Sequence, residues 1–410
     1  MSELTIIVVG GGAAGFFGAI AASETAPGAQ VTLLEKGGQF LSKVRISGGG
    51  RCNVTHACFD VRDFSARYPR GSKELISPFH QFDARSTISW FKARGVELKT
   101  EADGRMFPVT DSSQTIIDCL VGTAQKNGVQ MRTNSTVERI EKNQKGFRVL
   151  LFDGKALQAD KLLLATGGCR SEALGSLATS LGHTLQPPVP SLFTFHIELP
   201  WLRALSGVSL PEVEIAIPGT SLRERGPLLI THWGLSGPAV LKLSAWGARE
   251  LNRLNYQFTI ELNWLPHLSV EAVRNELLKR IQTNGAKMVV NSPISPLTAR
   301  FWEALVLSSG IAPETRWAGL SRAAQHHLSQ TISRTQFHVT GKSLNKDEFV
   351  TCGGVRLDEV NLKTMESKIS PGLYFAGELL DIDGITGGFN FQAAWTTGWI
   401  AGRSMALTSS

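Results

Sequence analysis

The stretch Leu4-Thr-Ile-Ile-Val-Val-Gly-Gly-Gly-Ala-Ala-Gly15 decides the fold. Its first six residues are mostly apolar and predict a strand, and the small and apolar residues from Ala13 to Glu24 predict a helix. Between them, Gly10, Gly12 and Gly15 satisfy the spacing G-x-G-x-x-G. Glycines at these positions allow a tight turn and a close approach of the backbone to a pyrophosphate, and the helix N-terminus offers N–H groups to the phosphates.

A second strand, Val31 to Leu34, follows the turn at Pro27-Gly28 and leads into Glu35. Glu35 lies 20 residues after Gly15, where a carboxylate can accept hydrogen bonds from an adenosine ribose. Strand, helix and strand make one βαβ unit, whose strands are parallel. The pattern predicts an α/β dinucleotide-binding domain; the alternative is a glycine-rich turn with an unrelated surface glutamate.

Length and composition are those of a globular enzyme of more than one domain. The chain has 410 residues, 42% hydrophobic and 19% charged, which predicts two or three domains. Its five cysteines are scattered, so we expect neither disulfides nor a structural zinc site, and no metal. The apolar stretch from Thr5 to Ala22 is rich in glycine and is preceded by Glu3, which argues against a membrane span or a secretory signal and favours a cytoplasmic location.

The net charge of +7 suits an anionic ligand, either a dinucleotide or a nucleic acid. The alternative is a mildly basic surface without a partner, because no run of five Lys or Arg residues occurs. The sequence leaves both open and makes no prediction of oligomeric state.

Along the chain, residues 37–61 predict a long functional loop, and amphipathic helices are expected near Asp83 and after Ser112, with Asp or Ser as N-caps. After residue 189 the pattern becomes β-like and then helical. The predicted domains are a dinucleotide-binding domain in two parts, 1–188 and 351–410, an inserted β-rich domain, 189–262 with 334–350, and a helical domain, 263–333.

Two glycine-rich stretches outside the first motif are candidates for cofactor contact. Ser47-Gly-Gly-Gly-Arg-Cys-Asn53 places charge and amide donors beside three glycines, which are costly unless something approaches the backbone closely. Gly377-Glu378 and Thr386-Gly-Gly-Phe-Asn390 precede the last helix, whose N-terminus would stabilise an anion on the ring edge of a reduced flavin. Within that helix, Gly398 and Gly402 are expected to allow close packing on the sheet.

Two residues are candidates for a catalytic role, each with an alternative. Cys52 is either a redox or acid group beside the cofactor or a small buried filler. His232, within Thr-His-Trp-Gly-Leu-Ser-Gly-Pro, either faces the substrate or is a structural turn histidine. Otherwise the catalytic residues are not predicted.

The chain resembles the bacterial NAD(P)/FAD-dependent oxidoreductase flavoproteins, including aminoacetone oxidase-like proteins, which have a glutathione-reductase-like FAD fold. The matching motifs span nearly the whole chain: GGGAAG at 10–15, SGGGRCN at 47–53, GRMFP at 104–108, LATGG at 164–168, THWGLSGPAVL at 231–241, TCGGV at 351–355, YFAGELLDIDG at 374–384 and TGGFNFQAAWTTGWIAG at 386–402. Glu378 stands where many related flavoproteins have Asp, and His56 stands where the family commonly has Asn.

The resemblance implies a Rossmann-like FAD-binding domain with an inserted β-rich and helical substrate or cap module. It implies FAD contacts for the following residues: Gly10, Gly12, Ala13, Ala14, Gly15, Glu35, Lys36, Lys43, Ser47, Gly48, Gly49, Gly50, Arg51, Cys52, Asn53, Thr166, Gly167, Gly168, Gly377, Glu378, Gly387, Gly388, Phe389 and Asn390.

The expected function is an FAD-dependent oxidoreductase that transfers a hydride between flavin and a small-molecule substrate held under the inserted module. NAD(P)H is expected as a transient donor without a domain of its own, because no second G-x-G-x-x-G with a following acidic residue occurs. Two alternatives stay open: reduction of a base in RNA, and a flavin-binding redox sensor without turnover.

Overall fold

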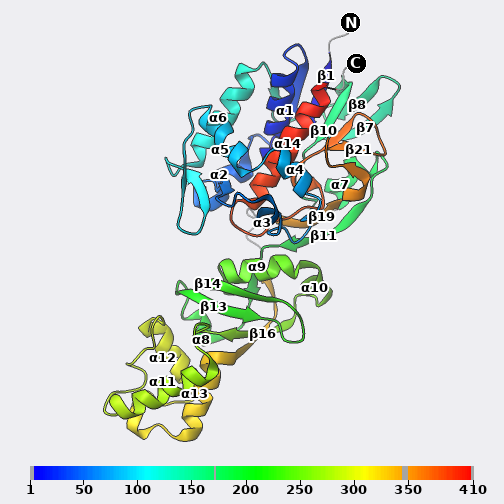
Figure 1. The fold of residues 1–410 in the computed structure, drawn as a ribbon. Coiled ribbons are helices and arrows are strands. Elements are labelled where there is room, and N and C mark those ends of the chain that lie inside the picture. Colours follow the sequence, from blue (N-terminus) through cyan, green and yellow to red (C-terminus); the bar gives the residue numbers. More distant parts are fainter. Residues whose placement is uncertain (1–3, 170–171, 344–349, 408–410) are drawn as a thin grey trace. The chain divides into compact units, whose positions relative to one another are not determined.

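The computed structural model describes residues 4–169, 172–343 and 350–407. The chain forms two compact units, the first from residues 1–191 with 346–410 and the second from residues 192–345 (Figure 1). Unit 1 is therefore built from both ends of the chain, and unit 2 is inserted into it. The division of the insert into a β-rich and a helical domain stays a prediction.

A seven-stranded sheet forms the centre of unit 1, in the order β20-β21-β22-β10-β1-β2-β6. Its parallel strands are β1 (Thr5–Val9), β2 (Gln30–Leu34), β6 (Gln130–Arg132), β10 (Lys161–Leu164) and β22 (Leu373–Phe375). The short strands β20 (Val360–Asn361) and β21 (Glu366–Ser367) extend it antiparallel. The predicted βαβ unit and the Rossmann-like fold are confirmed, because β1 and β2 are parallel neighbours joined by the helix α1 (Ala13–Thr25).

The first and last helices of the chain pack against each other in unit 1. Figure 1 shows α14 (Phe389–Leu407) running beside α1. A Cβ atom built on Gly398 would lie 2.4 Å from the carbonyl oxygen of Ala14, and one on Gly402 would lie 2.2 Å from that of Gly18. The expectation that these glycines pack on the sheet is corrected: the contact that requires them is helix to helix.

Alanine at position 398 is expected to destabilise the protein by about 1–3 kcal/mol, because its Cβ would collide with a backbone carbonyl that moves only if α1 moves. Gly122→Ala is the matched control. Gly122 lies within the exposed part of α6 (Ser113–Lys126), where an added Cβ meets nothing within 4 Å, so it should gain about 0.5–1 kcal/mol from helix propensity. Urea unfolding of both variants checks this; equal stabilities would contradict the packing argument.

Helix caps follow the sequence expectation, whereas the predicted loop at 37–61 does not. Asp83 caps α5 (Ala84–Lys92), and Ser112 caps α6 through the N–H of Gln114. Within 37–61 the chain forms α2 (Ser42–Gly50), which kinks at Ser47–Gly49. The prediction of a loop was wrong here because glycines mask the helical turn that precedes them.

Unit 1 contains further short elements around the sheet. They are α3 (Val61–Ser65), α4 (Ile76–Gln81), α7 (Glu172–Thr179), η2 (Leu357–Glu359), η3 (Gly377–Leu379), the antiparallel groups β3 (Thr55–His56), β4 (Leu98–Thr100) and β5 (Arg105–Pro108), then β7 (Val137–Asn143), β8 (Gly146–Leu151) and β9 (Ala156–Ala159), and the pair β11 (Leu185–Ser191) and β19 (Val350–Val355).

Unit 2 is an antiparallel sheet with helices. The sheet order is β17-β16-β13-β14-β15-β12-β18, with bounds β12 (Thr194–His196), β13 (Ser209–Ala216), β14 (Arg223–Thr231), β15 (Gly234–Ser236), β16 (Phe258–Asn263), β17 (Thr335–Val339) and β18 (Gly341–Ser343). Its helices are α8 (Pro200–Arg203), α9 (Pro238–Trp246), α10 (Ala248–Arg253), α11 (Val270–Thr283), α12 (Ala299–Ser308), η1 (Trp317–Gly319) and α13 (Arg322–Arg334).

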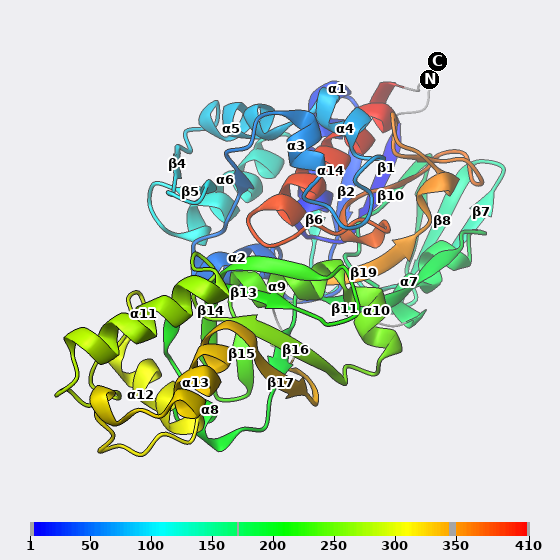
Figure 2. The same cartoon turned by 60° about the horizontal axis from the view of Figure 1, so that its bottom comes forward.

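Figure 2 shows α11, α12 and α13 gathered together, and their buried apolar residues form a core. Trp264, Trp302 and Trp317 are fully buried there, and Trp264 packs edge-on against Phe301 at 4.8 Å between ring centroids. Across residues 4–169, 172–343 and 350–407, no helix has both the length and the apolar character needed to cross a bilayer.

Candidate functional site

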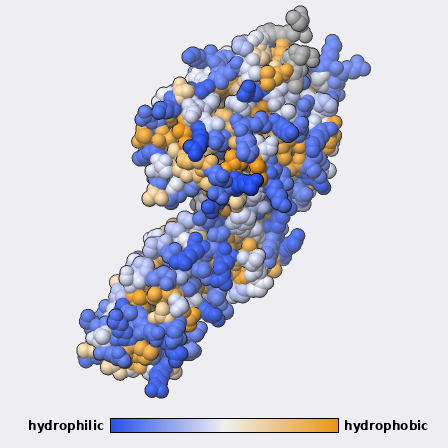
Figure 3. All heavy atoms as spheres, in the orientation of Figure 1, coloured by the Kyte–Doolittle hydropathy of each residue, from blue (hydrophilic) through white to orange (hydrophobic). Residues whose placement is uncertain are grey.

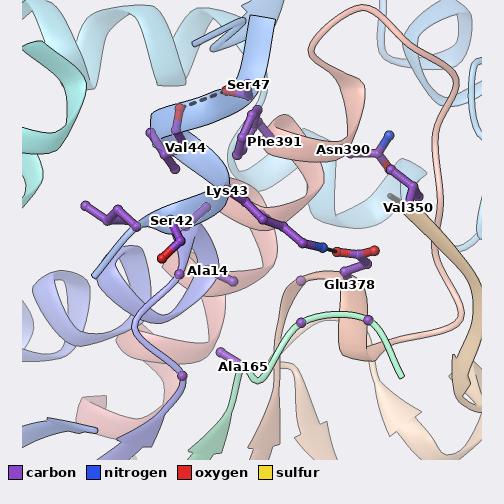
Figure 4. A pocket seen from close by; sticks show the side chains of 18 of the residues that line it. Ala14, Ser42, Lys43, Val44, Ser47, Ala165, Val350, Glu378, Asn390 and Phe391 are labelled. Atoms are coloured by element: carbon purple, nitrogen blue, oxygen red, sulfur yellow. Dashed lines mark hydrogen bonds and ion pairs between the residues drawn. The ribbon is translucent and has the colours of Figure 1, made fainter. Parts of the chain in front are cut away.

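A cavity with a volume of about 730 Å³ lies in unit 1. Four parts of the sequence meet in its walls: residues 10–14, residues 35–49, residues 165–168 and the C-terminal residues 376–394, with Val350 beside them (Figure 4). The volume lies within the range of sites for small molecules and cofactors. A site of this kind exists only in the folded chain, because its walls come from segments far apart in the sequence.

The first wall is the glycine turn between β1 and α1. A Cβ on Gly10 would lie 2.2 Å from the carbonyl oxygen of Ala165, so only glycine fits between the two strands. Gly12 is the N-cap of α1 and makes no side-chain cap, and a Cβ built on it meets nothing within 4 Å. The N-terminus of α1 thus opens onto the cavity with its backbone exposed, the arrangement that binds phosphate groups.

Glu35 is held at the end of β2 by two backbone hydrogen bonds. Its Oε2 accepts from the N–H of Gly11, and its Oε1 accepts from the N–H of Gly37, both at 2.8 Å. Each carboxylate oxygen has more than one acceptor position, so the side chain is oriented and still able to accept hydrogen bonds from a ligand. Since Glu35 also lines the cavity, its position suits recognition of ribose hydroxyls.

An ion pair spans another part of the cavity wall. Lys43 Nζ on α2 lies 2.5 Å from Glu378 Oε2 on η3, as Figure 4 shows. Glu378 Oε1 also accepts from the backbone N–H of Thr351 at 2.9 Å. A Cβ on Gly168 would lie 2.6 Å from this carboxylate, which explains a glycine there. The wall therefore presents a cation and an anion whose positions depend on each other.

The stretch of three glycines forms the kink at the end of α2. Gly48, Gly49 and Gly50 have φ values of 58°, 68° and 83°, in the left-handed region that glycine adopts without strain. Ser47 ends the helical turn by donating from its Oγ to the carbonyl of Val44 at 2.9 Å. Ser47, Gly48 and Gly49 line the cavity, so the kink turns the backbone along its wall.

Arg51 and Cys52, which follow the kink, are engaged within the protein. The Arg51 guanidinium pairs with Glu101 at 2.6 Å and lies 4.0 Å above the Phe107 ring. Cys52 is fully buried, and burial raises the pKa of its thiol to about 12. A thiol in that environment stays protonated at neutral pH, which favours the alternative of a small buried filler.

Asn53 and His56 connect the start of β3 to the C-terminal loop. With its amide oriented to suit its neighbours, Asn53 donates to the carbonyl of Thr55 and accepts from the N–H of Gly388, each at 3.0 Å. The His56 ring stacks on Phe389 at 4.8 Å between centroids, and its Nδ1 lies 3.0 Å from the carbonyl oxygen of Gly387. These residues brace the turn that leads into α14.

A buried ion pair stabilises the same C-terminal loop. Asp383 is fully buried and pairs through both carboxylate oxygens with Arg70, while Ser191 Oγ donates to it at 2.8 Å. Burial raises the pKa of Asp383 to about 6, against the opposing effect of Arg70. Its neighbour Ile382 lines the cavity, so this pair fixes part of the wall.

The structure brings most of the predicted cofactor residues together at the cavity: Gly10, Gly12, Ala13, Ala14, Glu35, Lys36, Lys43, Ser47, Gly48, Gly49, Thr166, Gly167, Gly168, Gly377, Glu378 and Asn390. The others do not line it: Gly15, Gly50, Arg51, Cys52, Asn53, Gly387, Gly388 and Phe389. Gly15 instead packs against the carbonyl of Gly10, which a Cβ would approach to 1.9 Å. His232 is exposed in the turn between β14 and β15, in unit 2.

Sequence reasoning missed several apolar or small residues of the wall, among them Leu41, Val44, Ile46, Ile382, Phe391 and Ala394. It also missed the pair of Arg70 and Asp383. Asp383 shares its segment with Glu378 and Asp381, so no local signal in the sequence distinguishes it from these acids.

The cavity fits an extended dinucleotide. Glycines at positions 12, 49 and 167 expose backbone where an added Cβ would meet no protein atom within 4 Å. Gly12 belongs to the wall that holds Glu35, and Gly49 to the wall that holds Lys43. The residues that line the cavity therefore suit one nucleotide at the end near α1 and the second part of a dinucleotide beside α2 and α14.

Comparisons with known proteins agree over the whole chain. Residues 4–404 match the model of the HI0933-like protein Rossmann domain. The ribosomal RNA dihydrouridine synthase of Escherichia coli (strain K12) is 32% identical over 420 residues, covering 100% of both chains. The 3-dehydro-bile acid delta(4,6)-reductase of Clostridium scindens is 31% identical over 411 residues, covering 97% of this chain and 98% of the relative.

A solved structure shares the fold at low sequence identity. The 3-ketosteroid delta1-dehydrogenase from Sterolibacterium denitrificans superposes with a TM-score of 0.52 at 12% identity, covering 99% of this chain and 100% of that one. The chain belongs to the HI0933-like family, flavoprotein oxidoreductases with a Rossmann FAD-binding fold.

Proposed function

We propose that this protein is an FAD-dependent reductase of a carbon–carbon double bond conjugated with a carbonyl group. The observation that carries the cofactor assignment is the cavity, where the glycine turn, the oriented carboxylate of Glu35 and the C-terminal loop line one space. FAD is favoured over FMN, because FMN lacks the adenosine that Glu35 would recognise.

The proposal gives each wall of the cavity a part in holding FAD. The backbone at Gly12 and the N-terminus of α1 bind the pyrophosphate, and Glu35 accepts from the adenosine ribose. Lys43, Glu378 and the kink at Gly48 and Gly49 line the same cavity and would hold the flavin part of the cofactor.

When bound, FAD supplies the hydride-transfer chemistry, and the protein supplies binding and electrostatics. The N-terminal turn of α14 contributes Asn390 and Phe391 to the cavity wall. Its partial positive charge stabilises negative charge that develops at that end. Lys43 adds a full charge, which Glu378 balances in part.

The substrate class rests on the two relatives. Their names describe saturation of uridine in ribosomal RNA and of the delta(4,6) bonds of a 3-dehydro-bile acid. In both substrates the double bond is conjugated with a carbonyl group, and such a bond accepts a hydride at the carbon remote from the carbonyl. The proposal includes unit 2 as the module that selects the substrate, and NAD(P)H as a transient donor that reaches the flavin by the route that the substrate uses.

The proposal is tested by mixing reduced holoenzyme, without oxygen, with unmodified ribosomal RNA or with a conjugated 3-oxo steroid. We expect the oxidised-flavin absorbance to return with one of the two and to stay at background with the matching saturated compound. Heat-released flavin should be FAD. If neither compound reoxidises the protein while oxygen does, the redox sensor without turnover is favoured instead.

A further inference from the structure

The positive charge of the chain is concentrated in unit 2. Residues 192–345 contain 15 Lys and Arg residues and 10 Glu residues but no Asp, so they carry +5 of the net charge of +7. Within the helical segment 263–334 the ratio is steeper, with 8 Lys and Arg residues to 4 Glu residues. The excess lies outside the unit that contains the cavity, so a nucleotide cofactor there does not account for it.

Most of these helical cations are exposed and take part in no ion pair within the described residues. They are Arg274, Lys279, Lys287, Arg300, Arg316, Arg322 and Arg334, of which Arg300 donates to the carbonyl of Ala204. Two of the four glutamates, Glu271 and Glu303, are exposed on α11 and α12, Glu314 precedes η1, and Glu276 pairs with Arg280. Unpaired cations on a surface attract polyanions at long range.

The helix α13 arranges its charges in one row. Arg322, His326, Gln330 and Arg334 recur every four residues, and we call them the α13 stripe. The opposite face is buried, with Leu328 and Ile332 fully covered. The stripe spans about 18 Å, since each residue of an α-helix rises 1.5 Å. Figure 3 shows hydrophilic side chains interspersed with apolar ones over this helical end of unit 2.

Arg322 does not stabilise its own helix, whereas Arg334 lies in the last turn, where the helix dipole favours a cation. α13 contains no acidic residue, so no side chain within the helix pairs with its arginines. Arg322 lies in the first turn, where the helix dipole disfavours a cation, although Ser321 supplies a normal N-cap to Ala324 at 3.1 Å. Helix stability therefore does not account for the position of Arg322.

We propose that the α13 stripe contacts the phosphate backbone of an RNA substrate. Arg supplies charge and several donors to a phosphate, and His and Gln supply further hydrogen bonds, which together position a nucleic acid without reading its sequence. A membrane surface is disfavoured, because a helix that lies on lipid needs an exposed apolar face and the apolar face of α13 is buried. This inference rests on the proposed function and selects RNA from its two substrate classes.

The test is binding of FAD-loaded protein to transcribed, unmodified ribosomal RNA, measured by fluorescence anisotropy from 50 to 300 mM salt. The stripe variant Arg322→Gln/Arg334→Gln should bind about 10- to 50-fold more weakly at 0.1 M salt, and its plot of log affinity against log salt should be shallower by about 1.4–1.8. The control Lys73→Gln/Lys145→Gln removes the same charge from exposed positions of unit 1 and should bind like the wild type.

Two outcomes overturn the inference: equal loss in stripe and control variants, or stripe-dependent binding to vesicles containing phosphatidylglycerol without binding to RNA. The proposed function fails separately. If RNA binds through the stripe but neither RNA nor the conjugated steroid reoxidises the reduced protein, the surface stands and the reductase assignment falls. If the steroid reoxidises both forms and RNA is not bound, the reductase stands and the stripe assignment falls.

Discussion

Valine at position 12 should give a folded protein that no longer retains FAD. Gly12 has φ −93° and ψ −168°, an extended conformation that β-branched residues adopt readily, so the backbone tolerates the change. A Cβ there meets nothing within 4 Å, so the apoprotein has no clash. The added methyl groups enter the space where the pyrophosphate must approach the backbone, at a cost of about 1–3 kcal/mol or more, equivalent to about 5- to 150-fold or more in affinity.

The measurement is the ratio of flavin to protein absorbance after gel filtration, together with the far-UV circular dichroism spectrum. Gly28→Val is the matched control, because a Cβ on Gly28 also meets nothing within 4 Å and Gly28 does not line the cavity. The control should retain flavin. A Gly12→Val protein with full flavin content would show that the cofactor lies elsewhere.

Methionine at position 70 should destabilise the protein by about 3–5 kcal/mol at pH 8, because it leaves the Asp383 carboxylate buried without its counter-ion. Asp383 is fully buried, and its remaining side-chain donor is Ser191. Loss of the pair also loosens the loop that places Ile382 in the cavity wall, so flavin retention should fall together with stability.

The penalty should depend on pH in a defined direction. Burial raises the pKa of Asp383 above its ordinary range to about 6, and Arg70 opposes that rise, so removing Arg70 raises the pKa further. A carboxyl with a raised pKa in the folded state contributes stability below its unfolded pKa and loses that contribution as pH rises through its folded pKa. The folded-state pKa of Asp383 is higher in the variant, so the variant continues to lose stability above pH 6, where the wild type no longer does. The difference in free energy of unfolding between the two proteins should therefore be small near pH 5 and grow through pH 6 to 8.

Urea unfolding at several pH values from 5 to 8 checks this, with Arg62→Met as control. Arg62 is an exposed residue of α3, and its substitution should shift stability little at any pH. A penalty for Arg70→Met that is constant across this range would contradict the role assigned to the titration of Asp383.

Local sequence spacing was enough to predict the nucleotide end of the site. The strand, the glycine turn and Glu35 lie within about 30 residues, and the constraints on them are steric and local. Gly15, for example, must fit beside the carbonyl of Gly10. Helix starts were predictable for the same reason, because Asp83 and Ser112 cap N–H groups two or three residues away.

The other parts of the site depend on contacts between residues that are far apart in the sequence. The Asp383–Arg70 pair joins residues 313 positions apart, and Asn53 meets Gly388 across the same loop. Neither partner carries a local signal, since a carboxylate or an amide finds its partner only after the backbone has brought the segments together. The sequence by itself determined the βαβ unit and the carboxylate at the end of its second strand. Only the tertiary structure decided which residues line the cavity and which support its walls, because these roles depend on contacts between distant segments and not on the residue pattern within one segment.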